Sequence, residues 1–236
     1  MITLKEINGF LKKYGDPQTK KTHISHGAKE PLYGVKVGDL KKILKLTGKN
    51  HELSLQLFAT GNSDAMYLAG LMADEKRITK EQLTDWVEKA YWYYLSEYAV
   101  PWVTAETDFG FELGLEWIES DKEHIASAGW ATLSSFASIN TDESLDLQTY
   151  SELLDYVSKK IHLSQNRVKY TMNNFVIATG CFISALCPKA LRIAGEICKV
   201  TVNMNGTSCK VPLAETYIQK VIDKQRVGLK KKTARC

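Results

Sequence analysis

The sequence predicts an all-α fold, a superhelical stack of antiparallel helix pairs (an α-α solenoid) with a concave face that can bind a partner. Three observations support this fold class. Apolar residues recur at helical spacing through most of the 236 residues. Hydrophobic residues make up 44% of the chain, enough for a large core. Capping boxes mark predicted helix starts at Thr3, Thr79 and Ser120, and only Val200–Val202 looks extended.

The helices follow one another with short loops. The first begins after Thr3, carries Ile7, Leu11 and Tyr14 on one face, and ends at Gly15. The boxes at Thr79 and Ser120 each open a further helix. The remaining helices are predicted over residues 39–46, 53–59, 65–72, 109–118, 150–161, 168–179, 189–199 and 213–222. Helix pairs begin near residues 39, 79, 120 and 164, close to the period of about 40 residues that is typical of HEAT-like repeats.

The net charge of +4 hides an uneven distribution. Residues 1–50 carry +7, residues 51–219 carry −9 and residues 220–236 carry +6. We therefore expect one HEAT-like domain over residues 1–222, followed by a basic and flexible tail over residues 223–236.

Several classes of protein are disfavoured. The longest apolar run, near Phe175–Cys187, is too short and too polar to cross a membrane, and the N-terminus lacks the pattern of a secretion signal. Five cysteines without a CxxC pair predict reduced thiols in the cytoplasm. Common enzyme motifs are missing. His23 and His26 are interpreted as exposed loop residues, so neither a metal nor another cofactor is expected.

The stretch from Tyr91 to Trp102 is dense in aromatic residues. On a helix, most of its rings would form one stripe, and core packing is the simpler interpretation of that stripe. Tyr93 and Glu97 lie four residues apart on another face, where a ring and a carboxylate could hold a cationic group between them.

Four segments together resemble one known family. They are Tyr93–Glu97 followed by Val100 and Pro101, Glu116–Asp121, Arg167–Phe175 and Tyr33–Ile43. In their order and spacing they are similar to motifs of the AlkD-like DNA alkylation repair enzymes, which are DNA glycosylases built from HEAT-like repeats. The resemblance covers roughly residues 1–200.

The resemblance implies roles for particular residues, several of them altered. Glu97 stands at the catalytic aspartate of the family, Tyr93 and Tyr170 at its two cleft tryptophans, Ser127 near its cleft arginine and Asn173 at the arginine of its Trp-x-Leu-Arg motif. The implied reaction removes alkylated, positively charged purines from duplex DNA. A carboxylate would stabilise the cationic sugar and aromatic faces would hold the base.

A DNA-binding role also requires basic residues near the phosphates. Residues 97–155 offer thirteen acids against Lys122 alone, so binding charge must come from elsewhere. The candidates for DNA-backbone contacts are Lys41, Lys42, Arg167, Lys169, Lys230, Lys231, Lys232 and Arg235. Cys236 is expected to be exposed and without a catalytic partner.

Three functions remain open at this stage. The first is a monomeric glycosylase for alkylated purines, the second a non-catalytic DNA-binding relative, and the third a HEAT-type scaffold that binds proteins. For a DNA-binding role, residues 1–50 and 220–236 should flank the concave face. Most acids between Glu97 and Asp155 should turn away from that face, with Glu97 itself inside.

Overall fold

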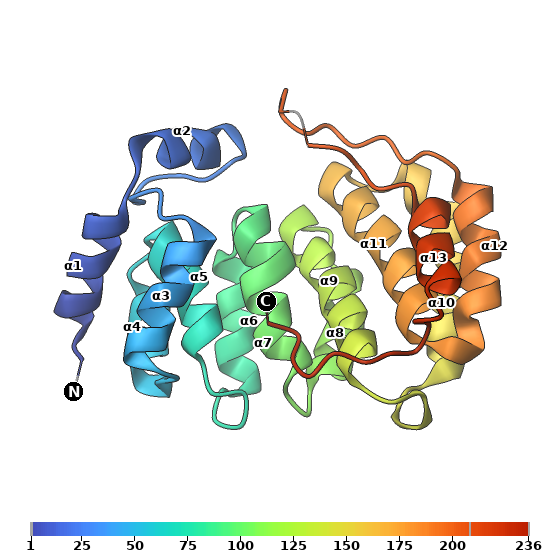
Figure 1. Cartoon of the computed structure of the whole chain (residues 1–236), viewed down its shortest axis with the longest axis horizontal. Coiled ribbons are helices and arrows are strands. Elements are labelled where there is room, and N and C mark those ends of the chain that lie inside the picture. Colours follow the sequence, from blue (N-terminus) through green and yellow to red (C-terminus); the bar gives the residue numbers. More distant parts are fainter. Residues whose placement is uncertain (1, 208, 236) are drawn as a thin grey trace.

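A computed structural model describes residues 2–207 and 209–235 of the chain. Figure 1 shows most of the helices standing side by side in a curved row from α1 to α12, with α2 lying across the top and α13 packed against α11 and α12, which confirms the predicted all-α stack. None of the described residues forms a strand, Val200–Val202 included. The expectation for Cys236 lies outside the described residues.

The first half of the chain ends with α7, near the centre of the row. Its elements are α1 (Leu4–Tyr14), α2 (Pro17–Ser25), α3 (Val37–Thr47), α4 (His51–Ala59), α5 (Ser63–Met72), α6 (Lys80–Lys89), the π-helical turn η1 (Leu95–Ala99) and α7 (Val100–Ala105).

The second half completes the row and carries three short 3₁₀ turns. Its elements are α8 (Gly110–Ile118), α9 (Glu123–Ile139), η2 (Asp142–Ser144), α10 (Leu147–Lys160), η3 (Ile161–Leu163), α11 (Asn166–Phe182), η4 (Ser184–Leu186), α12 (Cys187–Ile197) and α13 (Ala214–Asp223).

The predicted repeat spacing is confirmed. Helices α3, α6, α9 and α11 begin at Val37, Lys80, Glu123 and Asn166, each 43 residues after the one before. The capping boxes at Thr3 and Thr79 form as expected. The one at Ser120 does not, because the Ser120 hydroxyl accepts a hydrogen bond from the Lys122 N–H and α9 starts after it.

Two groups of buried apolar side chains form the interior, one in each half of the row. They meet at α9, which gives Ile125 and Ala128 to the first group and Trp130 and Leu133 to the second. Within the described residues, no single helix is long and apolar enough to cross a membrane. Helix α11 and the segment formed by η4 and α12 reach that length and hydropathy only when they are taken together, and the two are bent by 112° relative to each other.

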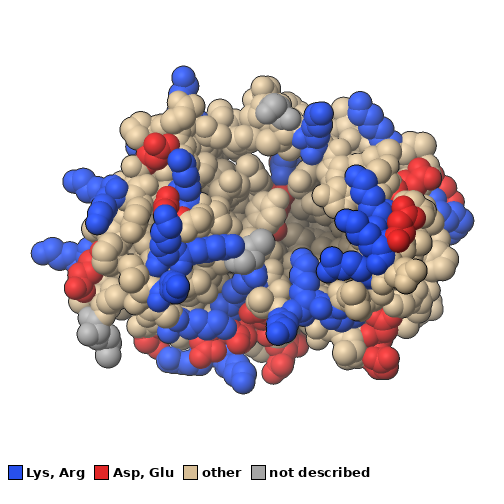
Figure 2. Space-filling model, viewed as in Figure 1, with Lys and Arg blue, Asp and Glu red and all other residues tan. Residues whose placement is uncertain are grey.

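Charged side chains are unevenly placed on the surface. On the face in Figure 2, Lys and Arg spread across the molecule, whereas Asp and Glu stand mainly along the lower edge and at the two ends. Many acids of the middle segment are engaged in ion pairs with basic residues. Examples are Glu112 with Lys80 and Glu88 with Lys122, each at 2.6 Å. Three other acids of this segment pair with basic residues of the two ends, namely Glu75 with Lys49, Asp142 with Lys230 and Glu106 with Arg235. These pairs offset part of its excess acidic charge.

The C-terminal tail does not follow the expectation of a flexible segment. After α13 it runs back across the molecule to the N-terminal half (Figure 1). Lys230 pairs with Asp142 at 3.0 Å and donates to the Ala137 carbonyl at 3.0 Å. The Lys231 N–H donates to the Ser138 carbonyl at 2.8 Å. The tail is therefore held to the end of α9 and to η2.

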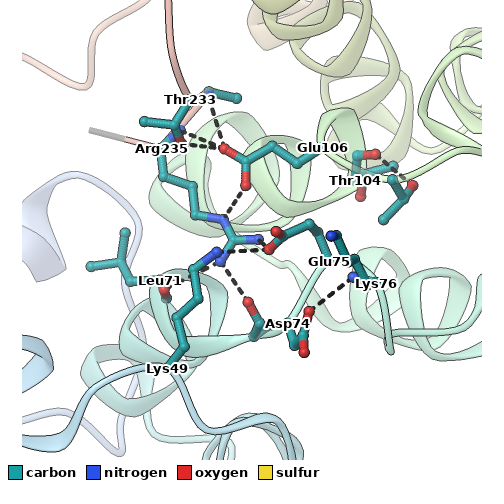
Figure 3. A network of polar contacts seen from close by, with 12 residues as sticks. Lys49, Leu71, Asp74, Glu75, Lys76, Thr104, Glu106, Thr233 and Arg235 are labelled. Carbon is teal, nitrogen blue, oxygen red and sulfur yellow. Dashed lines mark hydrogen bonds and ion pairs between the residues drawn. The ribbon is translucent and has the colours of Figure 1, made fainter.

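Arg235 anchors the end of this tail (Figure 3). Its guanidinium pairs with Glu75 at 3.0 Å and Glu106 at 2.9 Å, and it donates to the carbonyls of Leu71 at 3.3 Å and Ala73 at 2.6 Å. The Arg235 side chain is 7% exposed. We call residues 226–235 the C-terminal strap, because they connect the two halves of the row.

Candidate nucleic-acid interface

Glu97 lies in the middle of η1, a π-helical turn that sequence patterns did not predict. Such turns recur at functional sites. This one packs closely against α5 at Gly70. A Cβ atom added to Gly70 would lie only 2.7 Å from the Ala99 carbonyl oxygen, so no larger residue fits at that position. The Glu97 side chain is 3% exposed. The fold therefore fixes this carboxylate in the interior.

Arg167, the second residue of α11, covers the Glu97 carboxylate. Its Nε donates to Oε1 and its Nη2 to Oε2, each at 2.6 Å. Two parallel bonds of this kind fix the plane of the guanidinium. Burial raises the pKa of Glu97 to about 7, although Arg167 acts to lower it. Both carboxylate oxygens are thus engaged inside the protein.

Two tyrosines complete this arrangement. The Cζ atom of Arg167 lies 4.9 Å from the centroid of the Tyr93 ring and 4.5 Å from that of Tyr170. Aromatic faces attract a cation at such distances. Nη1 is the guanidinium nitrogen that Glu97 does not bind, and it lies 3.6 Å from the Met204 sulfur. The predicted aromatic walls and carboxylate do come together, but around the cation of Arg167.

A cavity opens beside this cluster. It measures about 490 Å³, and we call it the aromatic cavity. Its lining residues come from α3, α5, η1 and the two residues before it, α7, α11 and the segment before α13. They are Val37, Lys41, Tyr67, Tyr93, Tyr94, Tyr98, Trp102, Arg167, Tyr170, Met204, Cys209 and Lys210.

A second cavity of about 600 Å³ adjoins the first and lies against α2. The two share Val37, Tyr93, Tyr94 and Cys209, and together we call them the groove. The second is lined by Asp16, Gln18, Thr19, Thr22, His23, His26, Lys36, Val37, Tyr93, Tyr94 and Cys209.

The charge of the groove is positive. Four basic residues line it, namely Lys36, Lys41, Arg167 and Lys210, against the single acid Asp16. No acid between Glu97 and Asp155 is among these lining residues. One of these acids, Glu123, stands at the start of α9, where its Oε1 accepts a hydrogen bond from the Arg167 N–H at 2.8 Å, and the Glu97 side chain lies inside behind Arg167. That most of the other acids turn away stays a prediction. A groove of this sign can bind a polyanion.

Two predicted substrate-binding residues do not reach the groove. Ser127 is 0% exposed on α9 and Asn173 is 1% exposed on α11. The Nδ2 group of Asn173 donates to the Pro212 carbonyl at 2.9 Å and so supports the segment before α13. Neither side chain can touch DNA in this structure, because both are enclosed by neighbouring helices.

The predicted DNA-backbone residues divide into three groups. Lys41 and Arg167 line the groove. Lys42 is exposed on α3 and pairs with Asp39 at 2.7 Å, and Lys169 is half-buried on α11 outside both cavity linings. The four residues of the strap, Lys230, Lys231, Lys232 and Arg235, also lie outside both linings.

The strap lies at the opposite ends of the helices from the groove. Its partners follow the ends of α5 and α7 or belong to the last turn of α9, whereas Arg167 stands at the start of α11. Arg235 and Lys230 are engaged in ion pairs there, and their contact with phosphate stays a prediction. Lys231 and Lys232 are exposed.

Sequence patterns missed two contributions to the groove. His23 and His26 belong to α2 and its cap, not to an exposed loop, and His23 is buried with its ring 5.2 Å from that of Tyr94. This short helix lacks apolar residues at regular spacing, so no periodic signal marked it. Met204 and Lys210 come from an irregular segment with no motif of its own.

Comparisons with known proteins agree with this architecture. The family model for "DNA alkylation repair enzyme" matches residues 7–186. Uncharacterized proteins of Listeria monocytogenes and Listeria innocua are 35% and 34% identical over 227 residues, which is 93% of this chain and 97% of each relative.

A solved structure is also similar. It was described for a new family of proteins related to the HEAT-like repeat DNA glycosylases, with affinity for branched DNA structures. Its sequence is 36% identical to this chain and the TM-score of the two structures is 0.91. The match covers 100% of both chains. The chain therefore belongs to the DNA alkylation repair enzyme family and has its HEAT-like repeat fold.

Proposed function

We propose that this protein binds branched DNA through the groove and does not break glycosidic bonds. Of the three functions that the sequence left open, this is the second, the non-catalytic relative. The observation that carries it is the two-bond contact between Arg167 and Glu97. The scaffold function has less support, because the groove carries a net positive charge.

The Arg167 contact argues against the first function, glycosylase activity, for a physical reason. A glycosylase of this kind would need a carboxylate that faces the cationic sugar and an aromatic space for the cationic base. Here Arg167 already stands between Glu97 and the two tyrosines. A second cation would be repelled at that position, and Glu97 has both oxygens engaged.

Positive features of the groove support DNA as the ligand. Lys36, Lys41 and Lys210 can contact phosphates, which supply most of the affinity in protein–DNA binding. The solved relative is described as having affinity for branched DNA structures. The monomer remains the proposed binding unit.

Titration of labelled four-way and three-way junctions and of linear duplex, followed by fluorescence anisotropy, tests this proposal. We expect the junctions to bind more tightly than the duplex. Lys36→Gln should weaken junction binding and reduce the slope of log affinity against log salt by about 1, because Lys36 is exposed and lines the groove. Lys159→Gln is the matched control, because Lys159 is exposed on α10 and lines neither cavity.

A parallel assay measures bases released from methylated duplex DNA. We expect none from the parent protein. If bases are released, and Glu97→Gln abolishes the release, the protein is a glycosylase and the proposed function is wrong. Equal affinity for junctions and duplex would also contradict it.

A further inference from the structure

The aromatic cavity is unusual for a DNA-binding surface because half of its lining residues are aromatic. Six aromatic side chains line it, namely Tyr67, Tyr93, Tyr94, Tyr98, Trp102 and Tyr170. A surface that bound only the sugar-phosphate backbone would need basic groups and hydrogen-bond donors. Aromatic faces instead suit the flat face of a nucleobase, on which they stack.

The size of the cavity fits such a ligand. Its volume of about 490 Å³ falls within the range of roughly 300–1,000 Å³ of pockets that enclose small molecules. A whole duplex cannot enter a space of this size, whereas one base with its sugar can. The ligand must therefore be a base that has left the helical stack.

The polar groups of the cavity suit a nucleotide as well. Lys41 and Lys210 line it and can contact the phosphates on either side of the base. Nη1 of Arg167 is not bound by Glu97 and can donate to a base oxygen or ring nitrogen. No carboxylate is among the lining residues that would repel the phosphates.

The energetics favour a base that is already unpaired. Extruding a paired base requires unstacking and unpairing it, and this cost is smallest where the base has no partner. Stacking of one base on aromatic side chains gives a gain of similar size. The cavity therefore discriminates between DNA that already offers an unpaired base and DNA that does not.

We propose that the aromatic cavity takes up one unpaired nucleobase at the branch point of the bound DNA. This inference rests on the proposed function, since it assumes that branched DNA lies in the groove. It adds what is recognised at the branch, namely the face of a base as well as the backbone.

Three forms of one three-way junction test the proposal. They carry, at the branch, one unpaired adenosine, one abasic residue, or no unpaired residue. The first two have the same charge and similar flexibility, so they differ mainly in the base. We expect the adenosine junction to bind at least about fivefold more tightly than the abasic one, the gain from stacking one base.

Variants locate the effect in the cavity. Tyr170→Leu removes one aromatic face and should reduce the adenosine preference to within about twofold, whereas Tyr170→Phe should restore it. Tyr156→Leu is the matched control, because Tyr156 is 47% exposed on α10 and lines neither part of the groove. Tyr93→Leu gives a second measurement if Tyr170→Leu does not fold, as judged by thermal unfolding.

The two proposals fail in different ways. If the protein binds all three junctions tightly and equally, the base-binding inference is wrong and the proposed function stands. The same holds if Tyr170→Leu and Tyr93→Leu fold but keep the full adenosine preference. If no junction binds more tightly than duplex, both proposals are wrong.

Discussion

Arg167 and Glu97 are 70 residues apart in the chain, yet they form a two-bond ion pair in which the carboxylate side chain is 3% exposed and the guanidinium side chain 20%. Removing one partner of a buried pair leaves the other charge without compensation. At about pH 8 we expect Arg167→Leu to lower the free energy of unfolding by roughly 3–5 kcal/mol.

Chemical denaturation of the two single variants and the double variant measures this coupling. The Glu97→Leu/Arg167→Leu protein should be more stable than Arg167→Leu alone, because no buried charge is left unpaired. Lys122→Leu breaks an exposed pair with Glu88 and should change stability by less than about 1 kcal/mol. A double variant that is less stable than both single variants would contradict this account of the pair.

Glu97 should also give the protein a characteristic pH dependence. Burial raises its pKa to about 7 from an ordinary value of 4.5. Between these values the folded protein keeps a proton that the unfolded chain has lost. The stability that this proton contributes is therefore complete below about pH 4.5 and is lost as the pH rises through 7.

Comparison of the parent with Glu97→Gln isolates this effect. The difference in unfolding free energy should fall from about pH 5 to pH 8, by up to about 1.4 kcal/mol per pH unit. Burial lowers the pKa of His23 and His26, so they act in the opposite sense, but both proteins contain them. A difference that stays flat over this range would show that the pKa of Glu97 is not raised.

Basic residues of the groove and of the strap should differ in their effect on DNA binding. Lys41 lines the groove, whereas Lys232 is exposed on the strap. We expect Lys41→Gln to weaken junction binding and to reduce the slope of log affinity against log salt by about 1. Lys232→Gln should leave both unchanged.

Anisotropy titrations between about 50 and 200 mM salt measure these slopes. The pair of variants also decides whether the basic tail contacts phosphates. If Lys232→Gln lowers the slope as much as Lys41→Gln does, the DNA extends over the strap, and the groove is only part of the interface.

Much of the fold could be predicted because its signals are local. The apolar spacing around Leu83 and the capping box at Thr79 both belong to α6 itself. Such features depend on neighbours in the sequence, which periodic patterns record. The place of Tyr93 and Tyr170 in the groove had a different source, namely the resemblance to the family's two cleft tryptophans.

What could not be predicted depends on contacts between distant segments. The replacement of Asp by Glu at position 97 gave no sign that Arg167 would cover the carboxylate. The basic composition of the tail suggested a solvated end, but Arg235 finds Glu75 and Glu106 in the other half of the molecule. An isolated sequence pattern cannot show which distant charges will become partners.

Arg235 should contribute strongly to stability despite being next to last in the chain. Its loss would leave Glu106, whose side chain is 11% exposed, without its ion-pair partner. We expect Arg235→Leu to lower the free energy of unfolding by about 2–4 kcal/mol. Denaturant unfolding measures this, with Lys232→Gln as the exposed control on the same strap. A change below about 0.5 kcal/mol would mean that the strap is not held by this anchor.

The C-terminal strap also has a consequence for biosynthesis. Helices of a repeat stack mainly contact their neighbours, so they can form one after another as the chain leaves the ribosome. Arg235 reaches Glu75 across 160 positions, so it is made long after the helices that it fastens. The two halves can therefore be fastened together only after the repeats between them have been made, so the strap closes a stack whose helices already exist.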